Sequence, residues 1–515
     1  MIAVDQMRYD YLTRFAPLYK GGFKTLLDRG AVFTNALYRH AHCETAPGHS
    51  VILSGRHPSS TGIVENAWYD PQLKREINVV EDPASRPVGG PGRGASPANF
   101  IGFMIGDKLK EKWPQSRVVG ISLKDRSAVL LTGHRADAAY WFENACGCFI
   151  TSTYYAQQPP AWLEKFNSRC LADSYFKTPW SRLLRDEKLY LEYSREDDFP
   201  GEWDLEDTVF PHAHRGRPPD PAYYDNLRRT PFADDLLLEA ALEAFQAHDL
   251  GTRSSPDLFA VSFSAGDVIG HTYGPSSQES MDEYLRLDLV LDKLLKAVDA
   301  RVGLDQTLVI LSADHGVMPL VEWLRKQGIK DTRRVPATAL ENTVQKALKA
   351  RFPSAGNLIA TFHNPHFTLN LEAIHQHGLD RAEVERTAIK ALLATGAVAA
   401  VYTHADMFSK GPAEDPFIAL FRNSFFPARS PHLMVLPKKY YYIDNHPGGT
   451  GHGTPYEYDR HVPIVWMGAG IKPGRYADAA GPEDIAPTLA KMLGIDYPLE
   501  PDSRLLTEAL AGMRP

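Results

Sequence analysis

Apolar residues along this chain recur in two patterns that predict alternating strands and helices. Short continuous apolar runs are typical of strands buried on both faces, and they span residues 1–4, 118–123, 258–263, 308–312 and 462–467. Other segments repeat apolar residues every three to four positions, as amphipathic helices do, and they span residues 101–112, 234–248, 284–302 and 485–493. The alternation of the two patterns predicts an α/β fold.

Two long stretches interrupt this alternation. Residues 133–234 combine aromatic-rich strands with polar, proline-containing segments, and we interpret them as an insertion that roofs the site. Residues 331–445 show an α+β pattern, with a helix at 382–395 and a strand at 397–402, and we expect a second insertion without catalytic residues. One domain of 515 residues is then expected, with a core made of residues 1–132, 235–330 and 446–515.

Polar residues follow several of the predicted strands. Open α/β sheets bind ligands at the carboxyl ends of their strands, and the candidates at such ends are Asp5, Lys124 with Arg126, Asp267, and Asp314 with His315. Asp5 alone is equally well explained as a helix cap, and a Lys-x-Arg sequence is usually solvated at the surface. Both cations nevertheless suit an anion, because Arg grips phosphate oxygens in pairs and Lys acts as a point charge.

His271 and His452 extend this set of candidate metal ligands. Asp267 and His271 are four residues apart, so one helical turn places both on one face, and such oxygen and nitrogen pairs suit Zn²⁺. Asp314 and His315 precede a glycine, which permits a turn sharp enough for both side chains to converge on one ion. His452 lies in the loop GGTGHG, which lacks the GxGxxG spacing of a nucleotide-binding loop.

Thr45 is the candidate nucleophile. The sequence Thr-Ala-Pro-Gly lies between a β-like run at 31–37 and a helix-compatible run at 49–54, which places the Thr45 hydroxyl at a strand-to-helix turn. The first N–H groups of a helix are unpaired there and attract phosphate or sulfate. The alternative interpretation is an ordinary capped helix with a buried threonine.

The segment from Thr45 to Gly55, TAPGHSVILSG, resembles the sulfatase signature Cys-x-Pro-x-Arg-x-x-x-Leu-Thr-Gly with Thr in place of Cys. The chain is therefore similar to the alkaline phosphatase superfamily. A sulfatase needs a Cys or Ser that becomes formylglycine, whereas Thr45 followed by Asn66 in GIVEN resembles the phosphatase and phosphodiesterase branches. The sequence Ser-Leu-Lys-Asp-Arg, with Lys124 and Arg126, resembles the pair found in phosphate-irrepressible alkaline phosphatases of the PafA/PhoK type.

This resemblance implies an alkaline-phosphatase-like central, mostly parallel sheet flanked by helices, with two inserted subdomains and a site for two Zn²⁺ ions. The residues expected to hold one Zn²⁺ are Asp267, His271 and His452, and those expected to hold the other are Asp5, Thr45, Asp314 and His315. Carboxylate and imidazole ligands with an open position for substrate are what catalytic zinc requires. The sequence leaves open whether the protein has additional Ca²⁺ sites.

The implied activity is hydrolysis of phosphate monoesters through a phosphothreonine intermediate on Thr45. The Asn66 amide and the Ala46 N–H would bind one non-bridging oxygen of the phosphoryl group. Lys124 and Arg126 would hold the rest of its charge, as electrostatic stabilisation of phosphoryl transfer demands.

Two other functions stay open. A phosphodiesterase of the nucleotide pyrophosphatase type would share the two-zinc core, Thr45 and Asn66. Monoesters carry an additional negative charge that Lys124 and Arg126 could match, which favours the monoesterase. The non-enzymatic alternative is a metal-binding or adhesion protein on the same scaffold. The intact nucleophile and ligand set disfavours it.

Composition narrows the partners further. A net charge of −7 and a pI near 6.3 argue against a nucleic-acid binder, and no segment approaches the ~20 apolar residues of a membrane span. We therefore expect small phosphate monoesters as substrates and a monomer or weak oligomer. The sequence begins inside a predicted strand, so we expect a signal peptide outside this sequence and a periplasmic or secreted protein.

The four cysteines are too few for a disulfide scaffold. Cys146 and Cys148 lie in Cys-Gly-Cys, and a bridge from this pair to Cys170 is one option in an oxidising compartment. Reduced thiols are the equally weighted alternative. Cys43, two residues before Thr45, is expected to pack as a small buried hydrophobe.

Overall fold

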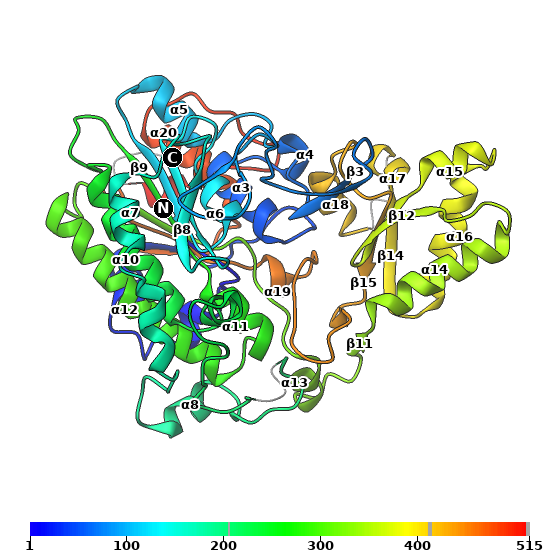
Figure 1. Cartoon of the computed structure of the whole chain (residues 1–515), viewed down its shortest axis with the longest axis horizontal. Coiled ribbons are helices and arrows are strands. Elements are labelled where there is room, and N and C mark those ends of the chain that lie inside the picture. The colour runs from blue at the N-terminus through cyan, green and yellow to red at the C-terminus, as the bar shows by residue number, and fades with distance from the viewer. Residues whose placement is uncertain (204–206, 410–414, 511–515) are drawn as a thin grey trace.

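The computed structural model describes residues 1–203, 207–409 and 415–510. Within these residues, ten strands form the central sheet, in the order β18-β2-β17-β10-β1-β9-β6-β7-β8-β5 (Figure 1). The strands are β1 (Ile2–Val4), β2 (Ala31–Phe33), β5 (Pro87–Val88), β6 (Val118–Ser122), β7 (Ala138–Glu143), β8 (Cys148–Ser152), β9 (Leu258–Phe263), β10 (Leu308–Ser312), β17 (Ile464–Gly468) and β18 (Gly474–Tyr476). The predicted α/β fold is confirmed.

The middle of this sheet is parallel and its flanks are largely antiparallel. Strands β10, β1, β9, β6 and β7 pair in parallel, whereas β17 runs antiparallel to β10 and β2, and β8 runs antiparallel to β7 and β5. The carboxyl ends of the parallel strands therefore meet at one edge of the sheet. The expected mostly parallel central sheet is confirmed.

Helices cover both faces of the sheet (Figure 1). One face packs against α2 (Gly22–Arg29), α10 (Phe232–Ala247) and α12 (Gln278–Arg301), and the other against α3 (Thr45–Ser54), α5 (Ile105–Lys112) and α20 (Ile485–Met492). Along β1, Ile2 and Val4 belong to the first core and Ala3 to the second. Burial on both faces explains the continuous apolar runs of the central strands.

The expected insertion at 133–234 is wrong in its first part. Strands β7 and β8 lie in that range, yet both extend the central sheet beside β6. The helix between β6 and β7 is α6 (Asp125–Val129), and its five residues are too short to show a helical repeat. The helices that follow, α7 (Ala161–Asn167), α8 (Glu187–Tyr193) and α9 (Pro221–Leu227), pack beside this part of the sheet and its helical cover.

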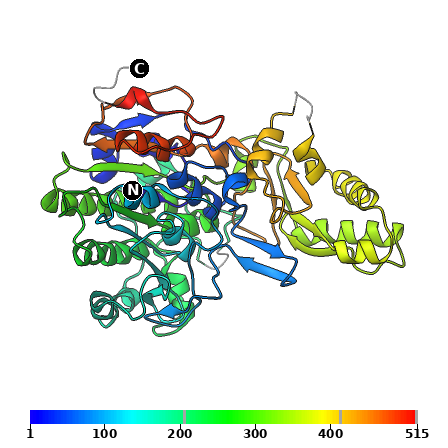
Figure 2. The ribbon, with the colours of Figure 1, turned by 90° about the horizontal axis from the view of Figure 1, so that it is seen from above.

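Residues 331–445 form a second lobe with a hydrophobic core of its own, which Figure 2 shows beside the main body. Its four-stranded sheet has the order β12 (Ile359–His363), β13 (His366–Leu369), β15 (Leu433–Pro437) and β14 (Val398–Thr403), and it packs with α14 (Ala337–Arg351) and α16 (Arg381–Ala394). The observed α16 and β14 lie within one residue of the predicted helix and strand. None of the predicted site residues lies in this lobe.

A hairpin from the main body contacts the second lobe. It consists of β3 (Ala67–Asp70) and β4 (Arg75–Asn78) and lies between the two parts in Figure 1. Thr361 Oγ1 donates to Glu76 Oε1 at 3.1 Å, and Lys74 Nζ pairs with Glu372 at 2.7 Å. Because β3 begins directly after Asn66, these contacts tie the lobe to a predicted site residue.

The cysteine pairing differs from the bridge to Cys170 that the sequence leaves open. Cys146 and Cys148 form a disulfide with each other, whereas Cys170 is free and exposed and Cys43 is free and buried. The bridge to Cys170 is therefore not made. Among the described residues, none of the helices combines the length and the hydropathy needed to cross a bilayer.

Candidate active site

Four adjacent parallel strands deliver the candidate residues. Asp5 follows β1, Asp314 follows β10, Lys124 follows β6, and Asp267 lies in α11 (Ala265–Tyr273) directly after β9. Because these strands are neighbours in the order β10-β1-β9-β6, the four side chains meet at one edge of the sheet.

Asp5, Asp314 and His315 form the first ligand group. All three are fully buried, and their ligand atoms lie within 4.8 Å of one another. His315 Nε2 is 3.6 Å from Asp5 Oδ1 and 3.5 Å from Asp314 Oδ2. Within the described chain these three atoms have no hydrogen-bond partner. Buried polar atoms are rarely left unpaired, so their convergence indicates a cation site.

Asp267, His271 and His452 form the second ligand group. His271 Nε2 and His452 Nε2 lie 3.3 and 3.9 Å from Asp267 Oδ1. The ring of His452 also stacks on that of His315 from the first group, with centroids 3.6 Å apart. The two groups are therefore adjacent, as a two-metal site requires.

Backbone carbonyls fix the orientation of the three histidines. Each histidine places Nδ1 within hydrogen-bond distance of a carbonyl oxygen: His271 with Thr450 (2.7 Å), His315 with Gly316 (2.9 Å) and His452 with Cys43 (2.8 Å). A carbonyl oxygen only accepts, so Nδ1 carries the proton and the Nε2 lone pair stays available for a metal. This is the tautomer that a zinc ligand needs.

Burial sets the protonation of several ligands. It lowers the pKa of His315 to about 4, and it holds the pKa of His452 well below its usual range, with His315 and His271 acting in the same direction. Burial also raises the pKa of Asp5 to about 6, and the neighbouring Asp314 carboxylate adds to this effect. Neutral imidazoles are the metal-binding form, and a bound dication would favour the ionised form of Asp5.

Thr45 is the first residue of α3 and is only 2% exposed. The first turn of this helix presses against the end of β10, because a Cβ at Gly48 would lie 2.1 Å from the Asp314 carbonyl oxygen. Glycine is therefore required there. His49 Nδ1 lies 2.8 Å from the Thr45 carbonyl oxygen and 3.1 Å from Asp314 Oδ2. The structure thus places the predicted nucleophile beside the first ligand group.

Asn66 also lies beside Thr45, but its contacts differ from the expected ones. The Ala46 N–H donates to Asn66 Oδ1 at 2.9 Å, and the Asn66 N–H donates to Glu44 Oε2 at 3.0 Å. The Ala46 N–H therefore orients the Asn66 side chain instead of standing free for an oxygen of the substrate. Asn66 Nδ2 is the donor of this pair that stays available for a phosphoryl oxygen.

Lys124 Nζ lies where the two ligand groups meet, 2.6 Å from both Asp5 Oδ2 and Asp267 Oδ2. The sequence predicts contact with a phosphoryl group, whereas the structure pairs this cation with two carboxylates. Arg126 follows on α6, and its buried Nε has no hydrogen-bond partner among the described residues. The role of both cations in binding substrate stays a prediction.

Gln6 is a candidate that the sequence pattern does not reveal. Its N–H donates to Asp314 Oδ1 at 3.0 Å and its Nε2 donates to Asp267 Oδ1 at 2.8 Å, so it contacts one carboxylate of each group. A Cβ at Gly270 would lie 1.9 Å from Gln6 Oε1. Gln6 also has a φ of 66°, a left-handed conformation that costs a non-glycine residue about 1–2 kcal/mol. Its position directly after Asp5 is the only sequence signal.

Replacing Gln6 with Ala should weaken metal binding, because Asp267 loses the Nε2–H donor that orients it, while the backbone N–H that donates to Asp314 is kept. Partners of this kind typically contribute 10- to 100-fold in metal affinity. Titration with a chelator should therefore remove the metal at correspondingly lower chelator concentration. Gln6→Gly, which relieves the left-handed backbone, should show the same weakening; wild-type metal retention in both variants would remove Gln6 from the site.

A third group of candidate ligands differs from the first two. His42, Glu65 and His366 are buried with ligand atoms within 4.8 Å of one another. His366 Nδ1, however, accepts the Val435 N–H at 3.0 Å, so its Nε2 carries the proton of the neutral ring. This tautomer is opposite to that of the histidines in the first two groups. In this group His366 therefore has the wrong tautomer for a metal ligand, whereas both ring nitrogens of His42 and Glu65 Oε1 are buried without a hydrogen-bond partner among the described residues.

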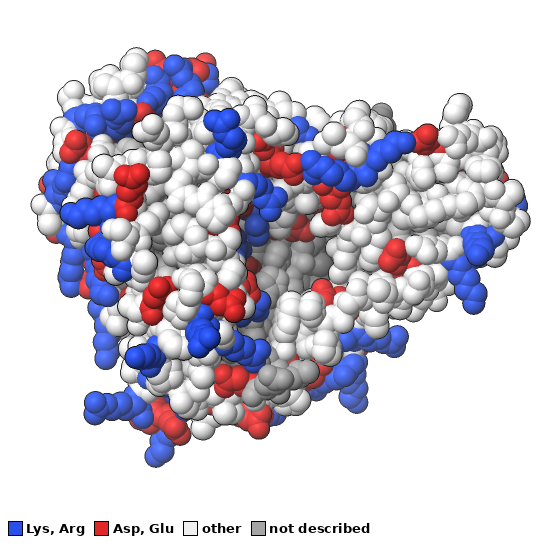
Figure 3. All heavy atoms as spheres, viewed as in Figure 1, with Lys and Arg blue, Asp and Glu red and all other residues white. Residues whose placement is uncertain are grey.

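A pocket of about 220 Å³ lies over the second ligand group. It is lined by His271, His452 and Glu44 from the main body and by residues of the second lobe that include His366. Figure 3 shows this face of the molecule hollowed between the main body and the lobe, with charges of both signs scattered around it. Substrate would reach the candidate site from this hollow.

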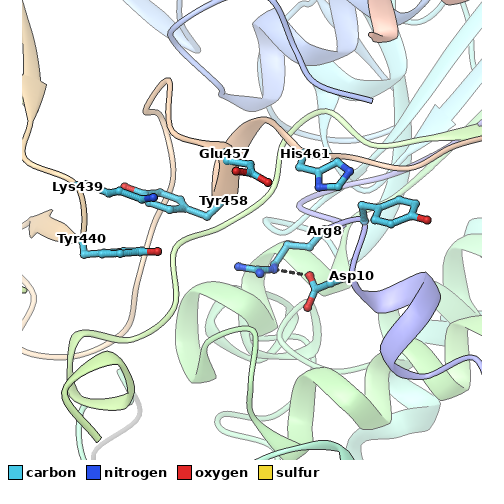
Figure 4. Close-up of a pocket in the computed structure, with 8 residues that line it drawn as sticks. Arg8, Asp10, Lys439, Tyr440, Glu457, Tyr458 and His461 are labelled. Atoms are coloured by element: carbon cyan, nitrogen blue, oxygen red, sulfur yellow. Dashed lines mark hydrogen bonds and ion pairs between the residues drawn. The ribbon is translucent and has the colours of Figure 1, made fainter. Parts of the chain in front are cut away.

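A separate pocket of about 250 Å³ contains none of the predicted site residues (Figure 4). Its lining includes Arg8, Lys439 and His461. Arg8 already donates to Asp10 at 2.6 Å and to the Val317 carbonyl oxygen at 2.9 Å. Arg8, the most buried cation of this pocket, is therefore already paired. We place the candidate active site at the two ligand groups and not in this pocket.

Comparison with known proteins decides the family. Residues 1–462 match the family described as type I phosphodiesterase / nucleotide pyrophosphatase. The chain belongs to this family. Among its relatives, alkaline phosphatase PhoV from Synechococcus elongatus is 33% identical over 99% of this chain and 92% of its own length. Alkaline phosphatase PafA from Elizabethkingia meningoseptica is 31% identical over 99% of this chain and 93% of its own length.

Solved structures support the assignment of this chain to the family. The crystal structure of wild-type PafA superimposes with a TM-score of 0.92 at 31% identity, covering 99% of this chain and 98% of PafA. Murine ectonucleotide pyrophosphatase/phosphodiesterase 5 gives a TM-score of 0.55 at 12% identity, which shows a shared fold. The resemblance to the PafA/PhoK type that the sequence predicts is therefore confirmed.

Proposed function

We propose that this chain is a metal-dependent phosphomonoesterase, an alkaline phosphatase that forms a phosphothreonine intermediate on Thr45. The observation that carries the proposal is the meeting of two adjacent ligand groups with Thr45 and Lys124 at one edge of the sheet. The donor set of carboxylates and imidazoles fits Zn²⁺, and the unpaired buried atoms of the first group point to a common ion. The relatives named alkaline phosphatase support the same activity.

The residues of the chain would act as follows. Thr45 Oγ forms a bond to phosphorus as the bond to the leaving oxygen breaks, and water later cleaves the phosphothreonine to release phosphate. Asn66 Nδ2 would hold one non-bridging oxygen, and Lys124 with Arg126 would hold the remaining charge. Zinc at the two groups would supply Lewis-acid stabilisation of the attacking and leaving oxygens. Cations bound to Asp5 and Asp267 would also free Lys124 for the phosphoryl group.

A solved variant of PafA supports these assignments. It carries substitutions at a threonine, an asparagine, a lysine and an arginine. The threonine and asparagine have the same separation along the PafA chain as Thr45 and Asn66 here, and the lysine and arginine the same separation as Lys124 and Arg126. The four types in the same order support a shared set of site residues.

The phosphodiesterase function is the second candidate, since the family description names it. A phosphate diester carries one negative charge fewer than a monoester dianion, and its second organic group needs room in the site. Lys124 and Arg126 add positive charge that favours the dianionic monoester. We therefore place diester hydrolysis as a side activity.

Comparison of para-nitrophenyl phosphate with bis(para-nitrophenyl) phosphate tests the proposal. The leaving group is the same in both, so their kcat/KM values at a pH where the monoester is a dianion report the preference of the site. We expect the monoester to react faster by at least about a hundredfold, the effect of one or two charged contacts. A preference for the diester would favour the alternative, and no turnover of either would exclude both enzymes.

We also expect two zinc ions per chain in the purified protein. The two ligand groups are separate sets that share no residue, so each should bind one ion. Elemental analysis of the fully active enzyme measures the ratio. One ion or none per chain at full activity would contradict the two-metal arrangement.

A further inference from the structure

The glycine-rich loop that carries His452 is pressed against residues 201–203, which we call the strap. A Cβ at Gly448 would lie 2.1 Å from the Glu202 carbonyl oxygen, so no larger residue fits at this position. Gly449 has a φ of 74°, a left-handed conformation that favours glycine. The first two glycines of the sequence GGTGHG are therefore explained by the close approach and turn of the loop at the strap.

Main-chain hydrogen bonds connect the strap to two neighbouring segments. The Gly449 N–H donates to the Gly201 carbonyl oxygen at 2.7 Å, and the Trp203 N–H donates to the Thr272 carbonyl oxygen at 2.8 Å. Thr272 directly follows one histidine of the second ligand group, and Gly449 lies three residues before the other. The strap thus bridges the two segments that carry these histidines.

The two segments also bind each other. The Thr450 N–H donates to the His271 carbonyl oxygen at 2.9 Å, and His271 Nδ1 donates back to the Thr450 carbonyl oxygen at 2.7 Å. The strap, the end of α11 and the glycine-rich loop are therefore each bonded to the other two. A shift of the strap would change the positions of His271 and His452 relative to each other.

A buried ion pair holds the strap in place. Arg195 is 2% exposed and Glu202 is fully buried, and the guanidinium of the first pairs with the carboxylate of the second. Arg195 also donates to the carbonyl oxygen of Tyr273, the last residue of α11, at 2.6 Å. Burial and the Glu279 carboxylate raise the pKa of Glu202, and Arg195 opposes them. One guanidinium thus links the strap to the end of α11.

We propose that Arg195 and Glu202 are positioning residues for the second metal ion, because they hold the strap that sets the relative positions of His271 and His452. This inference rests on the proposed two-metal arrangement. Both residues act through the main chain, since the strap is bonded to the backbone near each histidine. The first ligand group is carried by the ends of β1 and β10. Loss of the ion pair should therefore weaken the binding of one ion of the two.

Retention of metal in the presence of a chelator tests the proposal. Glu202→Gln removes the charge and keeps the shape of the side chain, and it should weaken one ion by about 10- to 100-fold, the usual effect of groups that orient metal ligands. Elemental analysis after dialysis against increasing chelator concentrations should show one ion lost early and the other retained as in wild type. Arg195→Met/Glu202→Leu should give the same result, and such apolar replacement of a buried pair usually preserves folding.

A second substitution assigns the lost ion to a ligand group. Glu202→Gln/Asp314→Ala also removes a ligand of the first group, so both ions should be lost at low chelator concentration. Glu202→Gln/His452→Ala should retain metal like His452→Ala alone, because both changes act on the same ion. Additive weakening in the second combination would place the effect of Glu202 at the first group and contradict the proposal.

Asp137→Asn is the matched control. It breaks a partly buried ion pair with Lys110, at 2.8 Å, where Asp137 also accepts the Val118 N–H at the start of β6, the end of that strand away from Lys124. This variant should retain both ions as wild type does, and so exclude a general effect of losing an ion pair.

Two results would overturn the proposal: equal weakening of both ions in Glu202→Gln, or wild-type retention of both. Thermal unfolding of the metal-free protein checks that the variant is folded, and the double apolar variant replaces it in every comparison if it is not. Fewer than two ions in the wild-type protein would instead contradict the two-metal arrangement, so the two failures are distinguishable.

Discussion

Replacing Thr45 with Ala should reduce kcat/KM for para-nitrophenyl phosphate by at least about 10⁴-fold. The hydroxyl is the proposed nucleophile, and removing a nucleophile leaves only the catalysis that positioning and charge provide. Thr45 is the first residue of α3 and supplies a single ligand atom, so the fold and most of the metal binding should persist. Steady-state kinetics, circular dichroism and elemental analysis of the same preparation measure the three properties.

Ser50→Ala is the matched control for this variant. Ser50 also lies in α3 and is buried, but its hydroxyl donates to the Pro47 carbonyl oxygen at 2.8 Å. Its loss should change turnover by no more than a few-fold. Near wild-type turnover in Thr45→Ala would move the nucleophile to another residue.

The double variant Lys124→Ala/Arg126→Ala should shift specificity from monoesters toward diesters. The two cations are expected to bind oxygens that a diester has esterified or that carry less charge. Removing one charged hydrogen-bond donor from a dry site costs on the order of 2–4 kcal/mol, so the ratio of monoester to diester kcat/KM should fall by at least about a hundredfold. Para-nitrophenyl phosphate and its bis ester provide the measurement.

Two controls accompany this variant. Lys24→Ala/Arg29→Ala removes the same number of charges from the exposed side of α2, and it should leave the ratio unchanged. Elemental analysis is needed because Lys124 also contacts Asp5 and Asp267. An equal fall for both substrates with the metal retained would mean that the cations serve the site generally, and the diesterase function would again be a full alternative.

Much of the candidate site could be named from the sequence because its signals are local. Asp5, Asp314 and Asp267 each follow a predominantly apolar strand, and such runs are easy to recognise. The Thr45 segment combines a turn, a glycine and a helix start in one short stretch. Local signals of this kind do not depend on knowing which strands are neighbours.

Other features depend on distant contacts and could not be predicted. Gln6 acts because two strand ends place Asp314 and Asp267 on either side of it. The Ala46 N–H turns out to bind Asn66 because the chain returns to α3 after twenty residues. The β7–β8 hairpin was assigned to an insertion because the helix that precedes it, α6, is too short to show a helical repeat.

The carbonyl partners of the three candidate metal-ligand histidines carry a consequence for how this enzyme can diverge. His271, His315 and His452 are held by main-chain oxygens, and every amino acid supplies such an oxygen whatever its side chain. Substitutions at those partner positions can therefore accumulate without turning the imidazole rings, as long as the backbone path is kept. Mutational drift around the site is buffered in this way.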